Sequence, residues 1–269
     1  MFRIGVVGAG GRMGRTVCTA VLGADDMELV CAIDPAAAGQ DLTELLEGPS
    51  PDLAVSGGID ALATAQVDVA VDFTTAAGIG TRLDWYAGHG VHAVVGTSGI
   101  PPSEVERARE LFANSSANAV IAPNFAVGAA LLTRFCELAA PVMDGVEIVE
   151  LHHEAKLDAP SGTALHTAER IAQARQESGA GPFVPDPTTE FPLEGARGGL
   201  GPAGIRVHAV RLPGLVAHEE VIFGAAGQTL TIRHDSYDRR SFMPGVLLAV
   251  RRVGERPGLT FGLGPLLGL

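Results

Sequence analysis

The sequence predicts an α/β protein built on a doubly wound parallel sheet, with an inserted α+β domain that carries an open mixed or antiparallel sheet. The first 124 residues repeat one pattern, in which a short apolar, β-branched run ends in a small-residue turn before a helical stretch. After residue 124 this alternation stops, and longer helical segments and strand-like runs follow. Alternating strands and helices are typical of parallel sheets, and the later change indicates a second domain.

Five runs in the first part have the length and composition of buried parallel strands. Such a strand is covered by helices on both faces, so its sequence is continuously apolar instead of alternating. Segments between the runs, such as RMGRTVCTAVLG and EVERARELFANS, carry helical spacing. The five runs cover residues 3–8, 28–34, 67–74, 91–99 and 118–125.

The residues after 124 predict a domain of a different kind. The expected elements are a helix at 126–143, a strand at 145–153, a helix at 161–177, a Pro- and Gly-rich loop at 179–204, strand-like runs at 205–212, 217–225 and 228–236, and a last helix at 241–258 with an apolar tail. We expect residues 125–238 to form the inserted domain, and residues 239–269 to return to the first domain, which covers 1–124.

Composition limits the functions to be considered. The chain of 269 residues has a formal net charge of −12, which argues against nucleic acid because phosphate binding needs a clustered basic surface. No apolar run approaches the roughly 20 residues of a membrane helix, and the N-terminal run is too short for a signal peptide. Three widely spaced cysteines without a CxxC pair are expected as reduced thiols. We therefore expect a cytoplasmic protein with a small-molecule substrate and no membrane or nucleic-acid partner.

A glycine-rich turn, GVVGAGGRMGR, joins the first run to the first helical segment. Glycines there let backbone N–H groups approach a pyrophosphate, whose charge the helix N-terminus also favours. The spacing is Gly8-x-x-Gly11-x-x-Gly14, and Asp34 at the end of the second run is placed to bind the ribose hydroxyls of NAD. The alternatives are a turn that only packs a helix on the sheet and an ordinary surface acid. The agreement of these features favours a Rossmann-type dinucleotide-binding domain.

Polar side chains follow three successive predicted strands, in the segments DFTT, GTSG and APNF. Because ligands of open α/β sheets bind at the carboxyl ends of the strands, Thr74, Thr97 and Asn124 are suited to hold a nicotinamide amide and ribose. Phe73 or Phe125 could flank the nicotinamide ring. Each residue alone is weak evidence, because Thr and Asn are common in turns.

The segment ELHHEAKLDAPSGTA, residues 150–164, gathers two histidines, a lysine and a small-residue turn. A metal site is disfavoured, because adjacent histidines on a strand point to opposite faces and no H-E-x-x-H spacing is present. A purely structural interpretation would pack one histidine and leave the other in water. The nearby lysine and turn favour an acid–base and anion site instead.

Within this segment, Ser161 is expected to be the N-cap of a helix. Free backbone N–H groups, together with the hydroxyls of Ser161 and Thr163, could bind a carboxylate there. His153 and Lys156 could contact the same or a second carboxylate. His152 or Lys156 could deliver the proton that accompanies a hydride transfer.

Several motifs resemble the dihydrodipicolinate reductase family of the lysine and diaminopimelate pathway: GAGGRMGR, VDFT, VVGTSG, IAPNFAVG and ELHHEAKLDAPSGTA, in this order. The later VHAVRLPGLVAHEEVIFG and LTIRHDSYDRRSFMPGVLLAVR match the second half of the family, so the resemblance spans nearly the whole chain. It implies NAD(P)H-dependent reduction of 4-hydroxy-tetrahydrodipicolinate to tetrahydrodipicolinate with loss of water. It also implies a Rossmann domain and a second domain that binds the dicarboxylate substrate and builds a homotetramer through its open sheet.

The resemblance also assigns roles to individual residues. It implies His152 and Lys156 as the proton-donating pair and His153 as a ligand of a substrate carboxylate, with no metal ligand. The substrate carboxylate would also be bound by Ser161, Gly162 and Thr163. The cofactor-binding positions, together with those argued above, are Gly8, Gly11, Arg12, Met13, Gly14, Asp34, Phe73, Thr74, Gly96, Thr97, Ser98, Ala122, Pro123, Asn124, Phe125, Arg239 and Phe242.

Two departures from the family pattern concern the cofactor site. The common GTTG is GTSG here, so Ser98 replaces a threonine and keeps a hydroxyl. NADPH-accepting sites often have a basic residue after the second strand, where this chain has Asp34 before PAAAG. Arg12 and Arg15 could still receive a phosphate. We expect both NADH and NADPH to be used, with NADH preferred.

Two other functions are compatible with a dinucleotide-binding fold. Another amino-acid-pathway NAD(P) dehydrogenase, such as an aspartate or homoserine dehydrogenase, gives no reason for LHHEAKLDAPSGT. A non-catalytic dinucleotide-sensing or scaffold protein would bind cofactor without turnover, but the candidate catalytic residues are intact here. The reductase is the function that the sequence favours.

Overall fold

The fold of the chain comes from a computed structural model, which describes residues 1–48 and 51–269. The chain divides into two compact units. Unit 1 comprises Met1–Phe125 and Phe242–Leu269, and unit 2 comprises Ala126–Ser241. The two boundaries lie one and three residues beyond those expected after residues 124 and 238.

Unit 1 is built on a parallel sheet, whose strand order among the residues described is β11-β5-β4-β3-β1-β2. The strands are β1 (Phe2–Val7), β2 (Met27–Ile33), β3 (Val69–Asp72), β4 (His92–Val95), β5 (Ala119–Ile121) and β11 (Leu259–Phe261). The chain starts at β1, adds β2 on one side, and then adds β3, β4 and β5 on the other. The sheet is therefore doubly wound, and its central strands β3, β4 and β5 are buried almost completely, as their apolar sequences predict.

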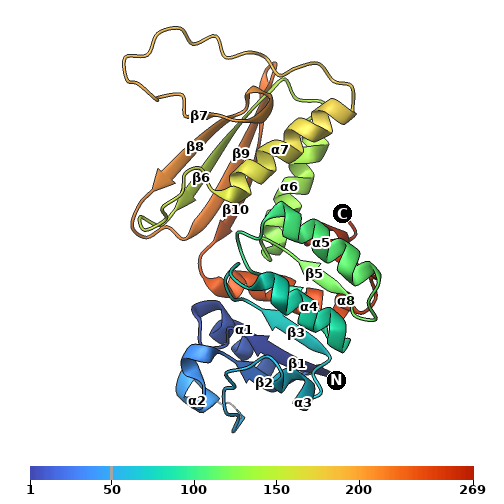
Figure 1. Ribbon diagram of the computed structural model, residues 1–269. Coiled ribbons are helices and arrows are strands. Elements are labelled where there is room, and N and C mark those ends of the chain that lie inside the picture. The colour runs from blue at the N-terminus through green and yellow to red at the C-terminus, as the bar shows by residue number, and fades with distance from the viewer. Residues whose placement is uncertain (49–50) are drawn as a thin grey trace. The chain divides into compact units, whose positions relative to one another are not determined.

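Helices cover both faces of this sheet (Figure 1). In front of it in the figure, α4 (Ile79–His89) packs beside α5 (Pro102–Ala113), while α1 (Arg12–Leu22) packs with α8 (Met243–Val253). The short α9 (Gly264–Leu267) contacts α8. Within the described residues of the whole chain, no helix is both long and apolar enough to cross a membrane.

The segment between β2 and β3 differs from the expected pattern of a full helix after each strand. Its described residues form only single turns, η1 (Pro35–Ala37), α2 (Leu42–Leu45) and α3 (Ala61–Thr64). Gly39 interrupts the segment with a φ of +85°, a left-handed conformation that no helix interior accommodates. The helical pattern predicted from the neighbouring segments is wrong here.

The end of the chain completes unit 1, where the sequence predicted only an apolar tail. β11 pairs in parallel with β5 and extends the sheet by one strand. Asn118 fixes this return, because its Nδ2 donates to the carbonyl oxygens of Val253 (3.1 Å) and Gly254 (3.3 Å). Its Oδ1 accepts from the N–H of Gly258, just before β11, at 3.1 Å.

Unit 2 is a mixed sheet with order β10-β9-β6-β8-β7 in the part of the chain that is described. Its strands are β6 (Gly145–His152), β7 (Gly199–Leu200), β8 (Arg206–Arg211), β9 (Ala217–Ala225) and β10 (Gln228–Ser236). β6 and β8 are parallel, and the other neighbouring strands are antiparallel. Helices α6 (Val127–Ala139) and α7 (Gly162–Glu177) pack together on one face of this sheet. The predicted fold class, a doubly wound parallel sheet with an inserted α+β domain, is confirmed.

The Pro- and Gly-rich segment at 179–204 is tied to unit 2 by arginine side chains. Arg175 of α7 donates to the carbonyl oxygens of Ala140 at 2.7 Å and Gly181 at 2.5 Å. Arg197 pairs with both Asp186 and Glu147, so it links the segment to β6. The segment ends in β7 and the single turn η2 (Pro202–Gly204).

The turn before α1 offers a test of the packing in unit 1. A Cβ at Gly14 would lie 1.9 Å from the carbonyl oxygen of Gly8, a backbone atom that cannot rotate away. We expect Gly14→Ala to lower the free energy of unfolding by about 1–3 kcal/mol, since overpacking forces the backbone to shift. Gly23→Ala is the control, because a Cβ there meets nothing nearer than 3.6 Å. Denaturant unfolding without cofactor measures both variants, and equal stability of the two would contradict this packing.

Candidate active site

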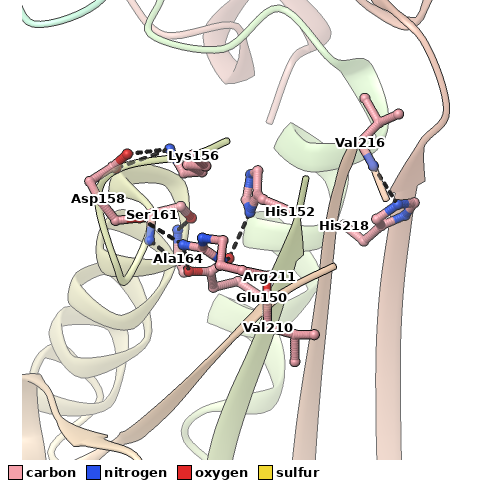
Figure 2. A network of polar contacts seen from close by, with 10 residues as sticks. All are labelled: Glu150, His152, Lys156, Asp158, Ser161, Ala164, Val210, Arg211, Val216 and His218. Carbon is pink, nitrogen blue, oxygen red and sulfur yellow. Dashed lines mark hydrogen bonds and ion pairs between the residues drawn. The ribbon is translucent and has the colours of Figure 1, made fainter. Parts of the chain in front are cut away.

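A buried carboxylate organises the candidate site of unit 2 (Figure 2). Glu150 is 0% exposed and lies on the same face of β6 as His152, because side chains two residues apart on a strand share a face. His152 Nδ1 lies 2.6 Å from Glu150 Oε2. Arg211, which pairs with His152 in the β6–β8 register, donates to both Glu150 oxygens at 2.8 and 2.7 Å. The N–H of Ser161 donates to Glu150 Oε1 at 3.0 Å.

These contacts keep Glu150 ionised. Burial alone would raise the pKa of Glu150, but the hydrogen bonds from Arg211, His152 and the Ser161 N–H outweigh it and hold that pKa below its ordinary value. An ionised carboxylate only accepts hydrogen bonds, so the Nδ1 that faces it carries a proton. Nε2 is therefore the nitrogen of His152 that is available to a substrate.

His152 is half-buried, and its neighbours shift its pKa in opposite directions. Burial lowers the pKa of His152, and the hydrogen bond and charge of Glu150 partly offset this effect. The positive charges of Lys156 and Arg211 add to the lowering. The net direction is down, so the ring releases a proton more readily than an exposed histidine does.

The helix start at Ser161 is confirmed. Ser161 is the N-cap of α7, and its Oγ accepts from the N–H of Ala164 at 3.2 Å. Gly162 and Thr163 are the first residues of the helix, whose first turn contains no acidic residue. Their N–H groups and the partial positive charge of the helix N-terminus favour an anion at this end.

Lys156 and His153 lie on the loop between β6 and α7. Lys156 Nζ pairs with the Asp158 carboxylate, with N–O distances of 2.7 and 3.0 Å. His153 is exposed, whereas its neighbour His152 is half-buried. Lys156 therefore acts on His152 through its charge, as the lowered pKa of His152 records, and its ammonium is held by Asp158 (Figure 2).

In unit 1, the glycine-rich turn has the geometry of an anion cradle. Gly8 adopts a φ of +84°, and Gly14 has no room for a Cβ beside it. Gly11 is the N-cap of α1 and, having no side chain, leaves the first N–H groups of the helix, at Arg12 and Met13, uncapped by side chains. Because no acid stands in that first turn, these donors suit a pyrophosphate.

Asp34 has a structural task that the sequence did not predict. Its Oδ2 accepts from the N–H of Gly10 at 2.9 Å, and its Oδ1 accepts from the N–H of Ala36 at 3.0 Å. The carboxylate thus ties the end of β2 to the glycine-rich turn. A carboxylate has about four lone-pair sites, so ribose hydroxyls could still donate to the half-exposed Asp34.

A second buried carboxylate, Asp72 at the end of β3, was not among the predicted residues. It accepts from Thr74 Oγ1 at 2.6 Å, from Arg82 Nε at 2.8 Å and from the Tyr86 hydroxyl at 2.9 Å. Thr97 is buried as well, and its hydroxyl donates to the Thr74 carbonyl oxygen at 3.3 Å. Both threonine hydroxyls are therefore engaged in shaping the strand ends, and the Thr74 N–H also donates to Asp72 Oδ1 at 3.0 Å.

The aromatic pair of the strand ends lies together. The Phe73 and Phe125 rings are 5.7 Å apart between centroids, and a Cβ at Gly96 would meet the Phe73 ring at 2.2 Å. Phe125 is only 2% exposed, so Phe73 is the ring of the two that offers a surface. Of the remaining predicted residues, Ser98, Pro123 and Arg239 are exposed, Asn124 and Phe242 are half-buried, and Ala122 is buried. Arg239 belongs to unit 2 and Phe242 to unit 1.

Two charged residues of the unit 2 site escaped the sequence analysis. Glu150 is two residues before His152 in the segment 150–164, and this strand spacing could have indicated that the two side chains share a face. Nothing in the sequence indicated Arg211, because only the pairing of β6 with β8 brings it next to His152. Among residues 1–48 and 51–269, no three His, Cys, Asp or Glu side chains converge as metal ligands.

The chain matches two family models. The model described as "Dihydrodipicolinate reductase, N-terminus" matches residues 2–125, and the model described as "Dihydrodipicolinate reductase, C-terminus" matches residues 128–267. Two curated relatives named 4-hydroxy-tetrahydrodipicolinate reductase align along almost their full length. The one from Nocardia farcinica is 48% identical over 268 residues, and the one from Mycobacterium marinum is 49% identical over 269 residues, with 99% of both chains covered in each case.

Solved structures agree with these matches. The dipicolinate-bound dihydrodipicolinate reductase from Paenisporosarcina sp. TG-14 has a TM-score of 0.86 at 38% identity, covering 98% of this chain and 99% of its own. An amine dehydrogenase from Mycobacterium smegmatis has a TM-score of 0.62 at 17% identity, covering 96% and 94%, and so shares the fold alone. The chain belongs to the dihydrodipicolinate reductase family and is an oxidoreductase that depends on a nicotinamide dinucleotide.

Proposed function

We propose that this protein reduces 4-hydroxy-tetrahydrodipicolinate to tetrahydrodipicolinate, with loss of water, in lysine and diaminopimelate biosynthesis. The observation that carries the proposal is the buried Glu150, which holds both His152 and the N-terminal end of α7. This arrangement would put a proton donor beside an anion site, and the reduction of a dicarboxylate needs both. The names of the full-length relatives support the same reaction.

Unit 1 would hold the cofactor, which supplies a hydride when bound. The uncapped N–H groups of Arg12 and Met13, with Gly11 before them, suit the pyrophosphate. Asp34 stands at the ribose end of the glycine-rich turn, and Phe73 with the ends of β3, β4 and β5 would line the nicotinamide half. The missing Cβ at Gly14 and the open end of α1 support such a site.

His152 would deliver the proton. The reaction consumes one hydride and one proton and releases one water. Glu150 holds the ring through Nδ1, so the proton to be transferred would be the one that Nε2 carries in the imidazolium form. Burial lowers the pKa of His152 in the free protein, and a bound dicarboxylate would oppose this effect, because nearby negative charge favours the imidazolium.

The substrate carboxylates would be bound around the start of α7. Ser161, Gly162 and Thr163 offer hydroxyl and N–H donors there, and the exposed His153 and the Lys156 ammonium add donors from the loop. The dihydrodipicolinate reductase from Paenisporosarcina sp. TG-14 was solved with bound dipicolinate, a planar dicarboxylate. That ligand supports a dicarboxylate site in this chain as well.

Three finer features complete the proposal. Asp34 after β2 places a negative charge where NADPH would bring a phosphate, so NADH would be preferred with both cofactors in use. Unit 2 would provide the substrate site and the contacts of a homotetramer, through the face of its sheet that α6 and α7 leave uncovered. A cytoplasmic location is the one that the sequence favours.

The proposed reaction can be tested by coupled turnover. The preceding synthase, supplied with pyruvate and aspartate semialdehyde, generates the substrate, and the loss of NADH absorbance is followed. We expect NADH oxidation that depends on this protein. A rate no greater than that of the synthase alone would refute the proposed function.

The same assay measures cofactor preference. We expect kcat/KM to be higher with NADH than with NADPH, because the Asp34 carboxylate repels the additional phosphate. Asp34 also holds the N–H of Gly10, so substitution there would disturb the turn, and the wild-type protein is the better probe. An equal or higher kcat/KM with NADPH would show that the Arg12 and Arg15 side chains outweigh Asp34.

Replacement of the proposed proton donor separates chemistry from binding. We expect His152→Gln to lower kcat by roughly 10²–10⁴-fold, the usual contribution of general acid catalysis, with the KM for the cofactor nearly unchanged. His89→Gln is the matched control, since His89 is an exposed histidine at the end of α4 in unit 1. Steady-state kinetics measure kcat and KM of both variants. A wild-type kcat in the His152 variant would show that His152 is not the proton donor.

A further inference from the structure

A cluster of buried polar side chains joins α4 to the loop after β3. Arg82 and Tyr86 are four residues apart on α4 and so share one side of that helix. Both donate to the same oxygen of Asp72, Oδ2, at 2.8 Å from Arg82 Nε and at 2.9 Å from the Tyr86 hydroxyl. Asp72 and Tyr86 are 0% exposed, and the Arg82 side chain is 17% exposed. The cluster therefore belongs to the interior of unit 1 and is not a surface ion pair.

The same cluster holds the loop that follows β3. Asp72 Oδ1 accepts from the N–H of Thr74 at 3.0 Å and from its hydroxyl at 2.6 Å. The two Nη atoms of Arg82 donate to the carbonyl oxygens of Ala77 at 3.1 Å and Thr75 at 2.8 Å. One guanidinium thus binds a carboxyl group and two loop carbonyls, a fork that a lysine ammonium does not reproduce.

Tyr86 is a permanent donor in this cluster. Burial and the neighbouring Asp72 raise the pKa of Tyr86 well above its ordinary value. The hydroxyl therefore keeps its proton and continues to donate to Asp72 at the pH values at which enzymes are assayed. The contact is a fixed support of the loop and not a switch.

Phe73 lies between the two residues that the cluster holds together, Asp72 and Thr74. A Cβ at Gly96 would come within 2.2 Å of its ring, so the ring packs directly on the backbone of the neighbouring strand end. The ring of Phe125 lies 5.7 Å away between centroids. Phe73 is half-buried, so part of its surface stays open at the edge of the sheet where ligands of this fold bind.

We propose that Arg82 and Tyr86 are positioning residues for the cofactor, which act through Asp72 to hold the Phe73 ring where the nicotinamide ring binds. The inference rests on the proposed placement of the nicotinamide half at the ends of β3, β4 and β5. A ring that is held in advance increases affinity, because less conformational freedom is lost on binding. The two α4 side chains thus act on the nicotinamide half of the cofactor and not on the half that binds at the glycine-rich turn.

Two probes that differ in the nicotinamide test this assignment. NADH carries both halves of the cofactor, whereas ADP-ribose lacks the nicotinamide. We expect Arg82→Gln to raise the Kd for NADH roughly tenfold, because the loosened ring loses its preorganisation, and to change the Kd for ADP-ribose by less than about twofold. Isothermal titration calorimetry on the protein without substrate measures both constants.

Arg107→Gln is the matched control. In the described part of the chain, Arg107 of α5 also binds α4, through the Asp84 carboxylate and the Gly80 carbonyl oxygen, and Asp72 is not among its partners. Its replacement should therefore leave both Kd values unchanged. An equal rise in Kd for the two probes in the Arg82 variant would indicate a general disturbance of unit 1 and overturn the proposal, as would an unchanged Kd for NADH.

Two milder variants carry the test where Arg82→Gln does not fold. Arg82→Lys keeps a cation beside Asp72 but cannot reach both loop carbonyls at once, and Tyr86→Phe removes a single hydroxyl. Each should raise the Kd for NADH by roughly threefold, the effect of about one lost hydrogen bond, with the Kd for ADP-ribose unchanged. Wild-type affinity for NADH in both variants would contradict the positioning role.

A double-mutant cycle shows whether the effect passes through Phe73. Phe73→Ala should itself weaken NADH binding, since it removes the ring. In that background Arg82→Gln should raise the Kd for NADH by less than about twofold further, because residues that act through one contact are not additive. Fold-changes that multiply would contradict the proposal. These measurements need neither substrate nor turnover, so failure of this inference and failure of the proposed reaction appear in different experiments.

Discussion

The carboxylate of Glu150 is the contact on which the candidate site of unit 2 depends. Donors reach it from His152 on β6, from Arg211 on β8 and from the Ser161 N–H before α7. One side chain therefore holds the His152 ring, links β6 to β8 and ties the start of α7 to the sheet. A buried charge that loses a partner costs about 3–5 kcal/mol, which makes this set of contacts nearly all-or-none. The geometry of the site and the stability of its surroundings therefore rest on the same atoms.

A second buried carboxylate has a similar environment at the end of β3 in unit 1. Asp72 ends a buried strand, is fully enclosed, and receives Arg82, Tyr86 and Thr74. In both units a buried carboxyl group near a strand end is satisfied by an arginine and by groups from the following loop. A hydrogen-bonded carboxyl group of this kind holds the following loop in one conformation. The backbone groups of that loop are then oriented before a ligand binds.

What the sequence could predict depended on how local the signal was. The first five strands of unit 1, the glycine-rich turn and the Ser161 cap are encoded by neighbouring residues, and they lie where they were expected. Arg211 was not predictable, because it is 61 residues from Glu150 and meets it only through the pairing of β6 with β8. Thr74 and Thr97 were expected to face a ligand, but their hydroxyls are turned to Asp72 and to the backbone, a choice that only the packed structure reveals.

The return of the chain to unit 1 has a consequence for biosynthesis. The last strand, β11, and the amide of Asn118 close the sheet with residues from beyond position 242. Unit 2 is contiguous and is complete once residue 241 has been made. In chain order, the inserted unit is therefore complete while the parallel sheet of unit 1 still lacks its edge strand β11. Unit 1 can complete its native pairing only after the final residues of the chain have been made.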